Sequence, residues 1–392
     1  MRDHPTSYDH PKTNQIVRFW SDHFKKKMTL DTVLNLILVC ILLLKVLFFI
    51  VPLRPSDHVK AYAAGDETYY VLSPNGDLIG WGTNDHLVVG TGTFIIYPYI
   101  ARKTILRHVS SMDVGYHCAM AVDKDGGLWG WGGSNDILLL EDSDEWKTIG
   151  NRPVKIMDDI ASVSLGTFYA AAVKTDGTLL VWGRDVLKKQ ISRPLSIMGD
   201  VKFVFAGSKA LFAIDTKGAL YCWCWDRQVE TMTGGPSDSL WLAANIAEVS
   251  YGGAVGQYQL RTTDGDVKVF DLDNGIPEID ELPVAASDVR ELCNGGVIKS
   301  DTSFWSWALV NADNTGSKEV VLTKQMEHVA AAANQALLID SNGRIYAGPN
   351  IGESFMLPHN VATVSPILRN AFILALIIKF IYSSYKTREK QT

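Results

Sequence analysis

The sequence lacks the residue patterns of the common catalytic sites. It has no Gly-x-Ser-x-Gly nucleophile turn, no His-Glu-x-x-His motif, no phosphate loop that ends in Gly-Lys-Ser/Thr, and no Cys-x-x-Cys pair. Each of these motifs fixes a nucleophile, a metal ligand or a phosphate-binding backbone in one geometry. We therefore expect no catalytic residue, no metal site and no cofactor.

Cysteine is also scarce, with five residues in 392. The number is odd, and Cys222 and Cys224 would point to one face of a strand, which is a poor geometry for a disulfide. We expect a domain that folds without disulfides. No asparagine opens an Asn-x-Ser/Thr acceptor site, which favours a bacterial surface over a glycosylating secretory pathway.

What the sequence does contain is a repeat, found seven times between residues 59 and 348. Each unit has a small β-rich run, a glycine, an apolar strand, a turn glycine eleven positions later, and an aromatic strand five positions after that. The four best units carry Gly65, Gly76 and Trp81; Gly115, Gly126 and Trp131; Gly166, Gly177 and Trp182; Gly207, Gly218 and Trp223. Later units degrade, with Gly265 before Phe270, Thr302 before Trp307, and Gly343 before Gly348.

A period of roughly 40 to 50 residues without helical periodicity predicts four-stranded units that stack radially. The predicted fold is all-β, a closed seven-bladed β-propeller. Asn75-Gly76 and similar Asn-Gly or Asp-Gly pairs predict two-residue hairpin turns with positive φ. An eighth fragment at 361–365 resembles the first strand of each unit and is expected to pair with the first or last blade, because an unclosed ring leaves strand edges exposed.

At these glycines and Trp-Gly pairs, residues 57–365 resemble the regulator of chromosome condensation repeat family. The best copies run from Gly115 through Asp125-Gly126 to Trp131-Gly132, and from Gly166 to Gly183. The resemblance implies the propeller fold. The family's characteristic histidine is kept only at His117, which we interpret as a structural hydrogen-bonding residue.

Two hydrophobic segments flank the repeats and set the expected domain organisation. The first is long enough to cross a hydrocarbon core of about 30 Å. A cleaved signal peptide is its alternative, and an interfacial helix is the alternative for the second. The expected parts are a cytoplasmic tail at 1–28, a transmembrane helix at 29–53, the propeller at 54–365, a second transmembrane helix at 366–385, and a cytoplasmic tail at 386–392.

The charges of these parts predict their location. Basic residues flank both hydrophobic segments on their outer sides, so the positive-inside rule places both termini in the cytoplasm and the propeller outside the plasma membrane. Residues 54–365 carry 25 Lys and Arg against 38 Asp and Glu, a net charge of −13. Nucleic-acid binding needs the opposite charge, so we expect no nucleic-acid partner, and a chromatin or nucleotide-exchange factor facing the cytoplasm is disfavoured.

The tryptophans of the repeat share one register, which indicates packing between adjacent blades rather than a ligand cage. Aromatic residues on the long connections are better candidates for contacts with a partner. These candidates are Phe94, Tyr97, Tyr99, Trp146 and Trp241. An acidic run at 271–281 has the residue types of a calcium loop, but its spacing fits a solvated acidic loop better.

The expected function is that of a non-enzymatic, membrane-anchored propeller that contacts lipid through two helices and presents a binding surface to a protein or cell-envelope partner. The alternative is an envelope enzyme or carbohydrate-acting protein with a site at the central channel, where propellers bring loops from all blades together. Carboxylates that converge at the channel mouth would favour this alternative.

Overall fold

The computed structural model describes residues 35–40, 60–64, 68–92, 100–115, 117–133, 150–186, 189–224, 239–253, 256–306, 320–322, 326–332, 335–341 and 345–348. The chain divides into two compact units. One unit is Leu53–Thr363, and the other joins Met1–Pro52 to Val364–Thr392.

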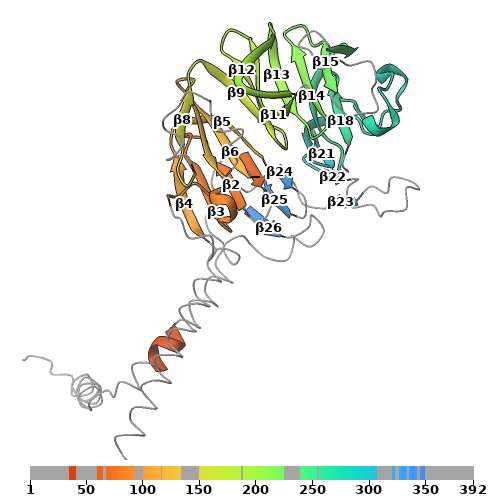
Figure 1. The fold of residues 1–392 in the computed structure, drawn as a ribbon. Helices are drawn as coiled ribbons and strands as arrows, with labels where there is room; N and C mark the ends of the chain where they lie inside the picture. Colours follow the sequence, from red (N-terminus) through yellow and green to blue (C-terminus); the bar gives the residue numbers. More distant parts are fainter. Residues whose placement is uncertain are drawn as a thin grey trace, which may run out of the picture. The chain divides into compact units, whose positions relative to one another are not determined.

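The unit Leu53–Thr363 is nearly all β, and its described strands form seven small antiparallel sheets in chain order (Figure 1). We number these sheets one to seven. Sheets one and two contain β1 (Lys60–Ala64), β2 (Thr68–Leu72), β3 (Leu78–Gly82) and β4 (Ile100–Leu106), then β5 (Val109–Val114), β6 (Cys118–Asp123), β7 (Leu128–Gly132) and β8 (Val154–Met157). Sheets three and four contain β9 (Ile160–Leu165), β10 (Tyr169–Lys174), β11 (Leu179–Val186) and β12 (Lys189–Met198), then β13 (Val201–Ala206), β14 (Ala210–Asp215), β15 (Leu220–Cys224) and β16 (Leu240–Ala243).

The last three sheets follow the same order of strands. Sheet five contains β17 (Ile246–Tyr251), β18 (Gln257–Thr262) and β19 (Val267–Asp271); sheet six contains β20 (Val289–Cys293), β21 (Gly296–Lys299), β22 (Phe304–Ser306) and β23 (Val320–Leu322); sheet seven contains β24 (Met326–Ala332), β25 (Gln335–Asp340) and β26 (Ile345–Gly348). Short 3-10 turns in the described residues include η1 (Asp85–Leu87), η3 (Leu272–Asn274) and η4 (Ile279–Glu281). This succession of small antiparallel meanders, with four described strands in five sheets and three in sheets five and seven, is the organisation of a β-propeller.

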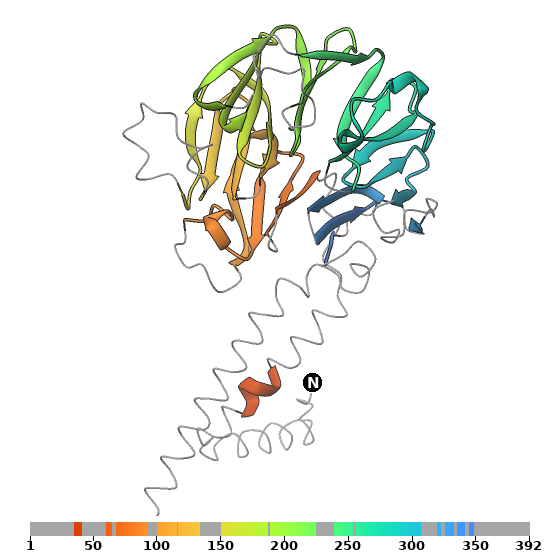
Figure 2. The ribbon, with the colours of Figure 1, turned by 45° about the vertical axis from the view of Figure 1, so that its right-hand side comes forward.

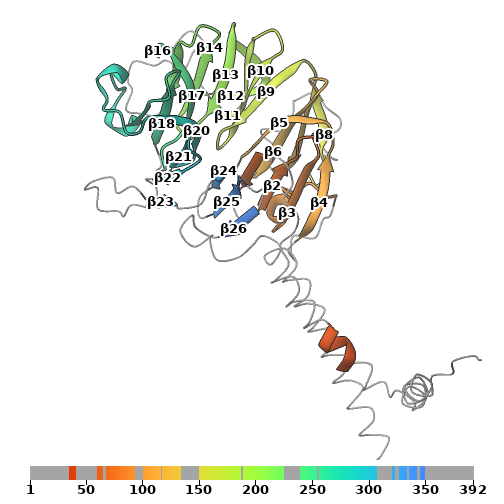
Figure 3. The ribbon, with the colours of Figure 1, turned by 180° about the vertical axis from the view of Figure 1, so that it is seen from behind.

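Each sheet packs face to face on the next, and Figures 2 and 3 show the succession from two further sides. Buried clusters join sheets one and two, two and three, three and four, four and five, and five and six. Sheet seven lies against sheet one, since β24 contacts β1 and a cluster joins Trp81 to Leu337 and Ile339. Sheet six contacts sheet seven through β20 and β21 against β24, and the order of contacts therefore returns to its start.

The repeat tryptophans lie between sheets, as their register predicts. Trp131 packs with Tyr70 of sheet one, Trp182 packs with residues of sheet two, and Trp223 packs with residues of sheet three. All four, including Trp81 against sheet seven, are at most 2% exposed. Each of these four repeat tryptophans thus fills the space toward the neighbouring sheet that precedes it in the order of contacts.

The predicted turn glycines join the second and third strands, but the turns have three residues rather than two. In sheet one, Ser73 N donates to Asp77 O (3.0 Å) and Gly76 N donates to Ser73 O (2.9 Å). Gly76 has φ 93°, whereas Asn75 stays outside the left-handed region. A two-residue turn of the predicted kind would need both residues at positive φ, so the sequence interpretation was wrong in this detail.

The same turn recurs with Gly126, Gly177, Gly218 and Gly265, all with φ between 84° and 90°. In sheet six, Thr302 takes the glycine position with φ 68°. Of the other repeat glycines, Gly115, Gly166 and Gly207 follow the first strands of sheets two to four, and each donates its N–H across the next hairpin. Gly65, Gly343, Trp307 and the fragment 361–365 lie outside the described residues.

Among the described residues, no helix combines the length and apolar character that a membrane crossing requires. The predicted spans at 29–53 and 366–385 lie outside the described part of the chain, except for residues 35–40, which are helical.

Candidate functional site

Of the five aromatic residues predicted to contact a partner, Trp241 falls in the described part of the chain. It lies on β16, the outer strand of sheet four, and 57% of it is exposed, more than any other large apolar residue described outside residues 35–40. Phe94, Tyr97, Tyr99 and Trp146 lie outside the described residues. Trp241 is therefore the candidate of this set whose position and exposure the structure describes.

The first strands of sheets two to four are joined by a chain of polar contacts. Asp113 of β5 accepts from Ser164 Oγ (3.0 Å) and Leu165 N (2.8 Å) of β9, and Ser164 Oγ in turn accepts from Ala206 N of β13 (3.0 Å). Burial raises the pKa of Asp113 above its ordinary value, although these bonds and that from Val114 N favour the charged form. The carboxylate fixes the spacing of neighbouring first strands.

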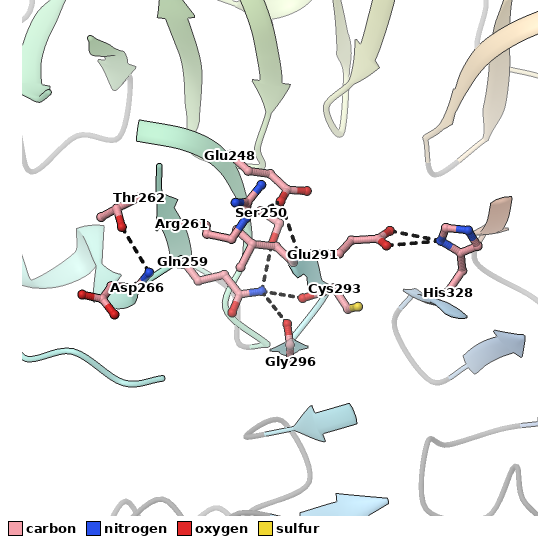
Figure 4. A network of polar contacts seen from close by, with 11 residues as sticks. Glu248, Ser250, Gln259, Arg261, Thr262, Asp266, Glu291, Cys293, Gly296 and His328 are labelled. Carbon is pink, nitrogen blue, oxygen red and sulfur yellow. Dashed lines mark hydrogen bonds and ion pairs between the residues drawn. The ribbon is translucent and has the colours of Figure 1, made fainter. Parts of the chain in front are cut away.

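A second polar network joins sheets five, six and seven (Figure 4). Glu248 of β17 accepts from Arg261 Nε of β18 (3.3 Å) and from Leu292 N of β20 (3.2 Å). Burial raises the pKa of Glu248, and the nearby negative charge of Glu291 acts in the same direction, while Leu292 N and Arg261 oppose it. Glu248 thus links sheet five to sheet six at the cost of a partly desolvated charge.

The amide of Gln259 adds to this junction (Figure 4). Gln259 is fully buried on β18, and its Nε2 lies 2.8 Å from Ser250 Oγ, 2.5 Å from Cys293 O and 3.1 Å from Gly296 O. Its Oε1 has no hydrogen-bond partner in the described part of the chain. The side chain therefore ties the carbonyls of sheet six to sheet five.

Charged residues also join sheets six and seven. His328 Nδ1 of β24 lies 3.2 Å from Glu291 Oε2 of β20, and the neighbouring Arg290 donates to Glu327 O (2.7 Å) and pairs with the Glu327 carboxylate (3.7 Å). Glu248 and Glu291 both come from first strands, and the charge of Glu291 acts on the pKa of Glu248. Each is engaged by a cation or a histidine.

Two histidines meet near sheets one and two. The rings of His86 in η1 and His117, which precedes β6, stack with centroids 3.6 Å apart and an interplanar angle of 22°. His86 has φ 52° and Leu87 has φ 61°. His117 therefore contacts the connection that follows β3.

The acidic run contains local capping contacts. Asp271 accepts from Asp273 N (2.9 Å) at the start of η3, Asp273 pairs with Lys209, and Lys268 Nζ donates to Ile279 O (2.9 Å). In the described ranges, no group of three His, Cys, Asp or Glu side chains is placed to hold a metal ion.

All five cysteines are free. Cys222 and Cys224 are buried on the same face of β15, with Sγ atoms 2.9 Å apart. Burial raises the pKa of Cys118 to about 12, so that thiol stays protonated at neutral pH.

Sequence reasoning missed the network of sheets five to seven. Three of its residues, Glu248, Glu291 and His328, occupy the third position of a first strand. In sheets two and three the corresponding residues are Ser111 and Ser162. An alignment of the repeats by strand position shows this change to ionisable residues. The spacing of glycine and tryptophan, on which the repeat was identified, carries no information about that position.

No protein-family model matches the sequence. A curated relative, the Rho GTPase-activating protein gacGG of Dictyostelium discoideum, is 30% identical over 114 residues, which is 28% of this chain. The match spans only 8% of the length of that relative.

Solved structures with a similar course of the chain have low sequence identity. Human WBSCR16 is 13% identical with a TM-score of 0.49, over 75% of this chain and 78% of that one. Prp20p of Saccharomyces cerevisiae, studied for its binding to Gsp1p and histones, is 17% identical with a TM-score of 0.45, over 75% and 72%. PorZ, a surface component of the Porphyromonas gingivalis type-IX secretion system, is 12% identical with a TM-score of 0.48, over 76% and 37%. Similarity at this level transfers no function to this chain.

Proposed function

We propose that this chain is a membrane-anchored, non-enzymatic propeller of seven blades, of the regulator of chromosome condensation type, that presents a binding surface to a protein or cell-envelope partner. The observation that carries the proposal is the closed order of sheet contacts together with one strongly exposed tryptophan. Each of the seven sheets supplies one blade, and Trp81 joins the last sheet to the first. A rigid ring of this kind holds surface side chains in fixed positions.

The membrane part of the proposal is supported by the hydrophobic runs at 29–53 and 366–385. Within the first run, residues 35–40 are helical, and Leu36, Ile37 and Val39 are 56%, 43% and 51% exposed. Apolar side chains on several sides of one helix suit contact with lipid. Flanking cations favour termini in the cytoplasm and a propeller outside a bacterial plasma membrane.

A protein partner fits the charge of the propeller better than a nucleic acid does. The net charge of −13 over residues 54–365 repels phosphate backbones. The carboxylates of the first strands bridge neighbouring sheets through Leu165 N, Leu292 N and His328. Asp113, Glu248 and Glu291 are thereby used to hold the ring together, which favours a scaffold over a hydrolytic site.

Crosslinking of intact cells that produce the full chain, followed by purification and mass spectrometry, tests the proposal. We expect a reproducible protein partner that is absent when residues 29–53 are deleted. Protease digestion of intact cells and of inverted vesicles checks sidedness, and we expect cleavage within 54–365 only from outside. Recovery of the chain alone under several crosslinking conditions would contradict the proposal.

A further inference from the structure

Sheet five differs from its neighbours at its outer edge. In sheets one to four and in sheet six, a fourth strand covers the third one: β4 on β3, β8 on β7, β12 on β11, β16 on β15 and β23 on β22. In sheet five the whole connection from β19 to β20 is described, and it contains η3, η4 and no strand. The outer edge of β19 therefore has no strand that covers it along its length.

One contact does form at this edge, at the start of β19. Val267 N donates to Ala286 O (2.8 Å), and Ala285 N donates to Val267 O (2.7 Å). Two residues of the connection thus face one residue of β19, which is the arrangement of a bulge and ends the pairing. The connection runs antiparallel to β19 here, so Val284, which precedes this contact, lies on the side of Val269. Val284 is 48% exposed.

The next backbone groups on the outer edge of β19 belong to Val269 and Asp271. In an antiparallel strand, the N–H and C=O of every second residue point to the same edge. Val267 points outward, whereas Leu272 N donates toward β18, to Gly256 O (3.1 Å). Val269 and Asp271 therefore point outward like Val267. Within the described part of the chain, nothing hydrogen-bonds to the N–H or the C=O of Val269.

The usual protections of a free sheet edge are absent from this stretch. Natural edges are commonly protected from the addition of a strand by proline or by an exposed lysine. Residues 269–271 contain no proline. Lys268 is turned away, since its Nζ donates to Ile279 O (2.9 Å) and Asp280 O (3.1 Å) of η4. An extended segment therefore finds free backbone groups here, and pairing with such groups is how strand addition binds a partner.

The surface beside this edge is acidic. The two contacts of Lys268 hold η4 against β19, and η4 contains Asp280 and Glu281, with Glu278 just before it. These three side chains are exposed, and none has an ion-pair partner among the residues that the structure describes. They attract a segment that carries Lys or Arg. A second copy of this chain would bring the same acidic turn to the edge, and like charges would oppose the pairing.

We propose that residues 269–271, which we call the β19 edge, bind an extended, basic segment of a protein partner by strand addition. The proposal rests on the proposed function, since it names the surface and the partner chemistry for that binding role. The partner segment exchanges backbone hydrogen bonds with Val269. Its Lys or Arg side chains lie beside Glu278, Asp280 and Glu281.

The first experiment places a photo-crosslinking amino acid at position 284 of the full chain in the producing cell. Phe168, 41% exposed between β9 and β10, is the control position. We expect a protein adduct at least about fivefold stronger at 284 than at 168, because 284 borders the edge that pairs with the partner. Mass spectrometry should map the adduct to a partner segment rich in Lys or Arg.

Two substitutions at Val269 test the backbone contact. Proline removes the N–H of this residue without breaking a bond to β18, because that N–H points to the outer edge. Val269→Pro should weaken the adduct at 284 at least about fivefold, the effect of about one lost hydrogen bond. Val269→Thr keeps the N–H and the branched shape, so it should change the adduct by less than about twofold. Circular dichroism of both purified chains verifies that the fold is retained.

A charge reversal tests the partner chemistry without touching the strand. The double substitution Asp280→Lys and Glu281→Lys should weaken the adduct at 284 at least about fivefold. Asp125→Lys, at an exposed carboxyl in the turn of sheet two, is the matched control and should change the adduct by less than about twofold. The charge reversal decides the test if Val269→Pro does not fold.

The other outcomes overturn the inference in distinguishable ways. A lipid adduct, an adduct of the chain with itself, or a partner segment without basic residues at 284 would refute the assigned partner. An adduct that neither Val269→Pro nor the charge reversal weakens would refute the β19 edge. No protein adduct at 284, with a partner still recovered by general crosslinking of intact cells, would refute the edge and leave the proposed function standing. Loss of both would contradict the proposed function as well.

Discussion

The carbonyl oxygen of Gly76, in the turn of sheet one, accepts a hydrogen bond of 2.9 Å from the backbone nitrogen of Val109, the first residue of β5 in sheet two. The same bond joins Gly126 to Ile160, Gly177 to Val201, Gly218 to Ile246, Gly265 to Val289 and Thr302 to Met326. The turn residue therefore does more than reverse the chain. It fixes where the next sheet begins.

Replacing Gly76 with alanine tests this role. An added Cβ would lie 3.0 Å from Val109 O, and the φ of 93° is unfavourable for alanine. We expect a loss of about 2 kcal/mol in the free energy of unfolding, because a left-handed residue costs roughly 1–2 kcal/mol and the bond to sheet two is also displaced. Chemical denaturation of the full chain in detergent measures this change in the free energy of unfolding.

Gly199→Ala is the control for Gly76→Ala. A Cβ added at Gly199 would have no other atom within 4 Å, and the backbone there is outside the left-handed region. We expect this substitution to leave stability unchanged within about 0.5 kcal/mol. Equal effects at the two glycines would contradict the role of the Gly76 turn.

Thr302 offers the converse experiment. It is a β-branched residue at φ 68°, in the position that glycine fills in five other sheets. Thr302→Gly should raise the free energy of unfolding by about 0.5–1 kcal/mol, since relief of the backbone penalty exceeds the added entropy of the unfolded chain. Thr302→Ala, which keeps the unfavourable conformation, should give no such gain. A loss of stability in the glycine variant would show that the Thr302 hydroxyl matters more than its backbone.

The periodic part of the fold was predictable from the sequence because its residues have strong local requirements. Gly126 and Trp131 are five positions apart, which puts the turn and the buried ring in fixed places on one hairpin. The left-handed residues before the first strands were not predictable in this way. Five residues take φ near 60° there, and three of them are aspartates, but aspartate is also common elsewhere in the chain and does not mark the position: His108, Asp159, Asp200, Asn245 and Asp288.

The polar network that joins sheets five, six and seven was not predicted for a related reason. Glu291 and His328 are brought together by the contact between sheets six and seven, although 37 residues separate them. A pair of residues so far apart in the sequence cannot be predicted from the spacing of neighbouring residues. Trp241 was singled out because the sequence placed it in a long connection between repeat strands, but the structure puts it on strand β16.

The two kinds of tryptophan should respond differently to truncation. Trp131 is fully buried and donates from Nε1 to Val88 O at 2.7 Å. Trp131→Ala should cost about 3–5 kcal/mol, through the cavity that it leaves and the loss of the hydrogen bond from Nε1. Trp241→Ala should change the unfolding free energy by less than about 0.5 kcal/mol. Thermal denaturation of both variants gives the comparison, and a large loss at Trp241 would show that it packs on its own domain.

The lowered pKa of Asp123 predicts how the free energy of unfolding depends on pH. Burial alone would raise its pKa, but hydrogen bonds from Trp129 Nε1 (2.7 Å), Gly127 N (2.8 Å) and Asp125 N (2.9 Å), together with Lys155, lower the pKa overall. A carboxyl with a lowered folded pKa stabilises the fold above its unfolded pKa of about 3.9. That contribution is lost as the pH falls through the folded value.

The Asp123→Asn variant isolates this effect. We expect wild type to be more stable than the variant at pH 7, and the difference to shrink as the pH falls from about 4 toward the folded pKa, because a protonated Asp123 no longer accepts all three bonds as a charge. Urea denaturation at intervals between pH 7 and pH 3 measures the difference. Asp264→Asn is the matched control, since Asp264 is an exposed carboxyl in the corresponding turn of sheet five. A difference between wild type and Asp123→Asn that stays constant across this range would show that the turn does not depend on the charge of Asp123.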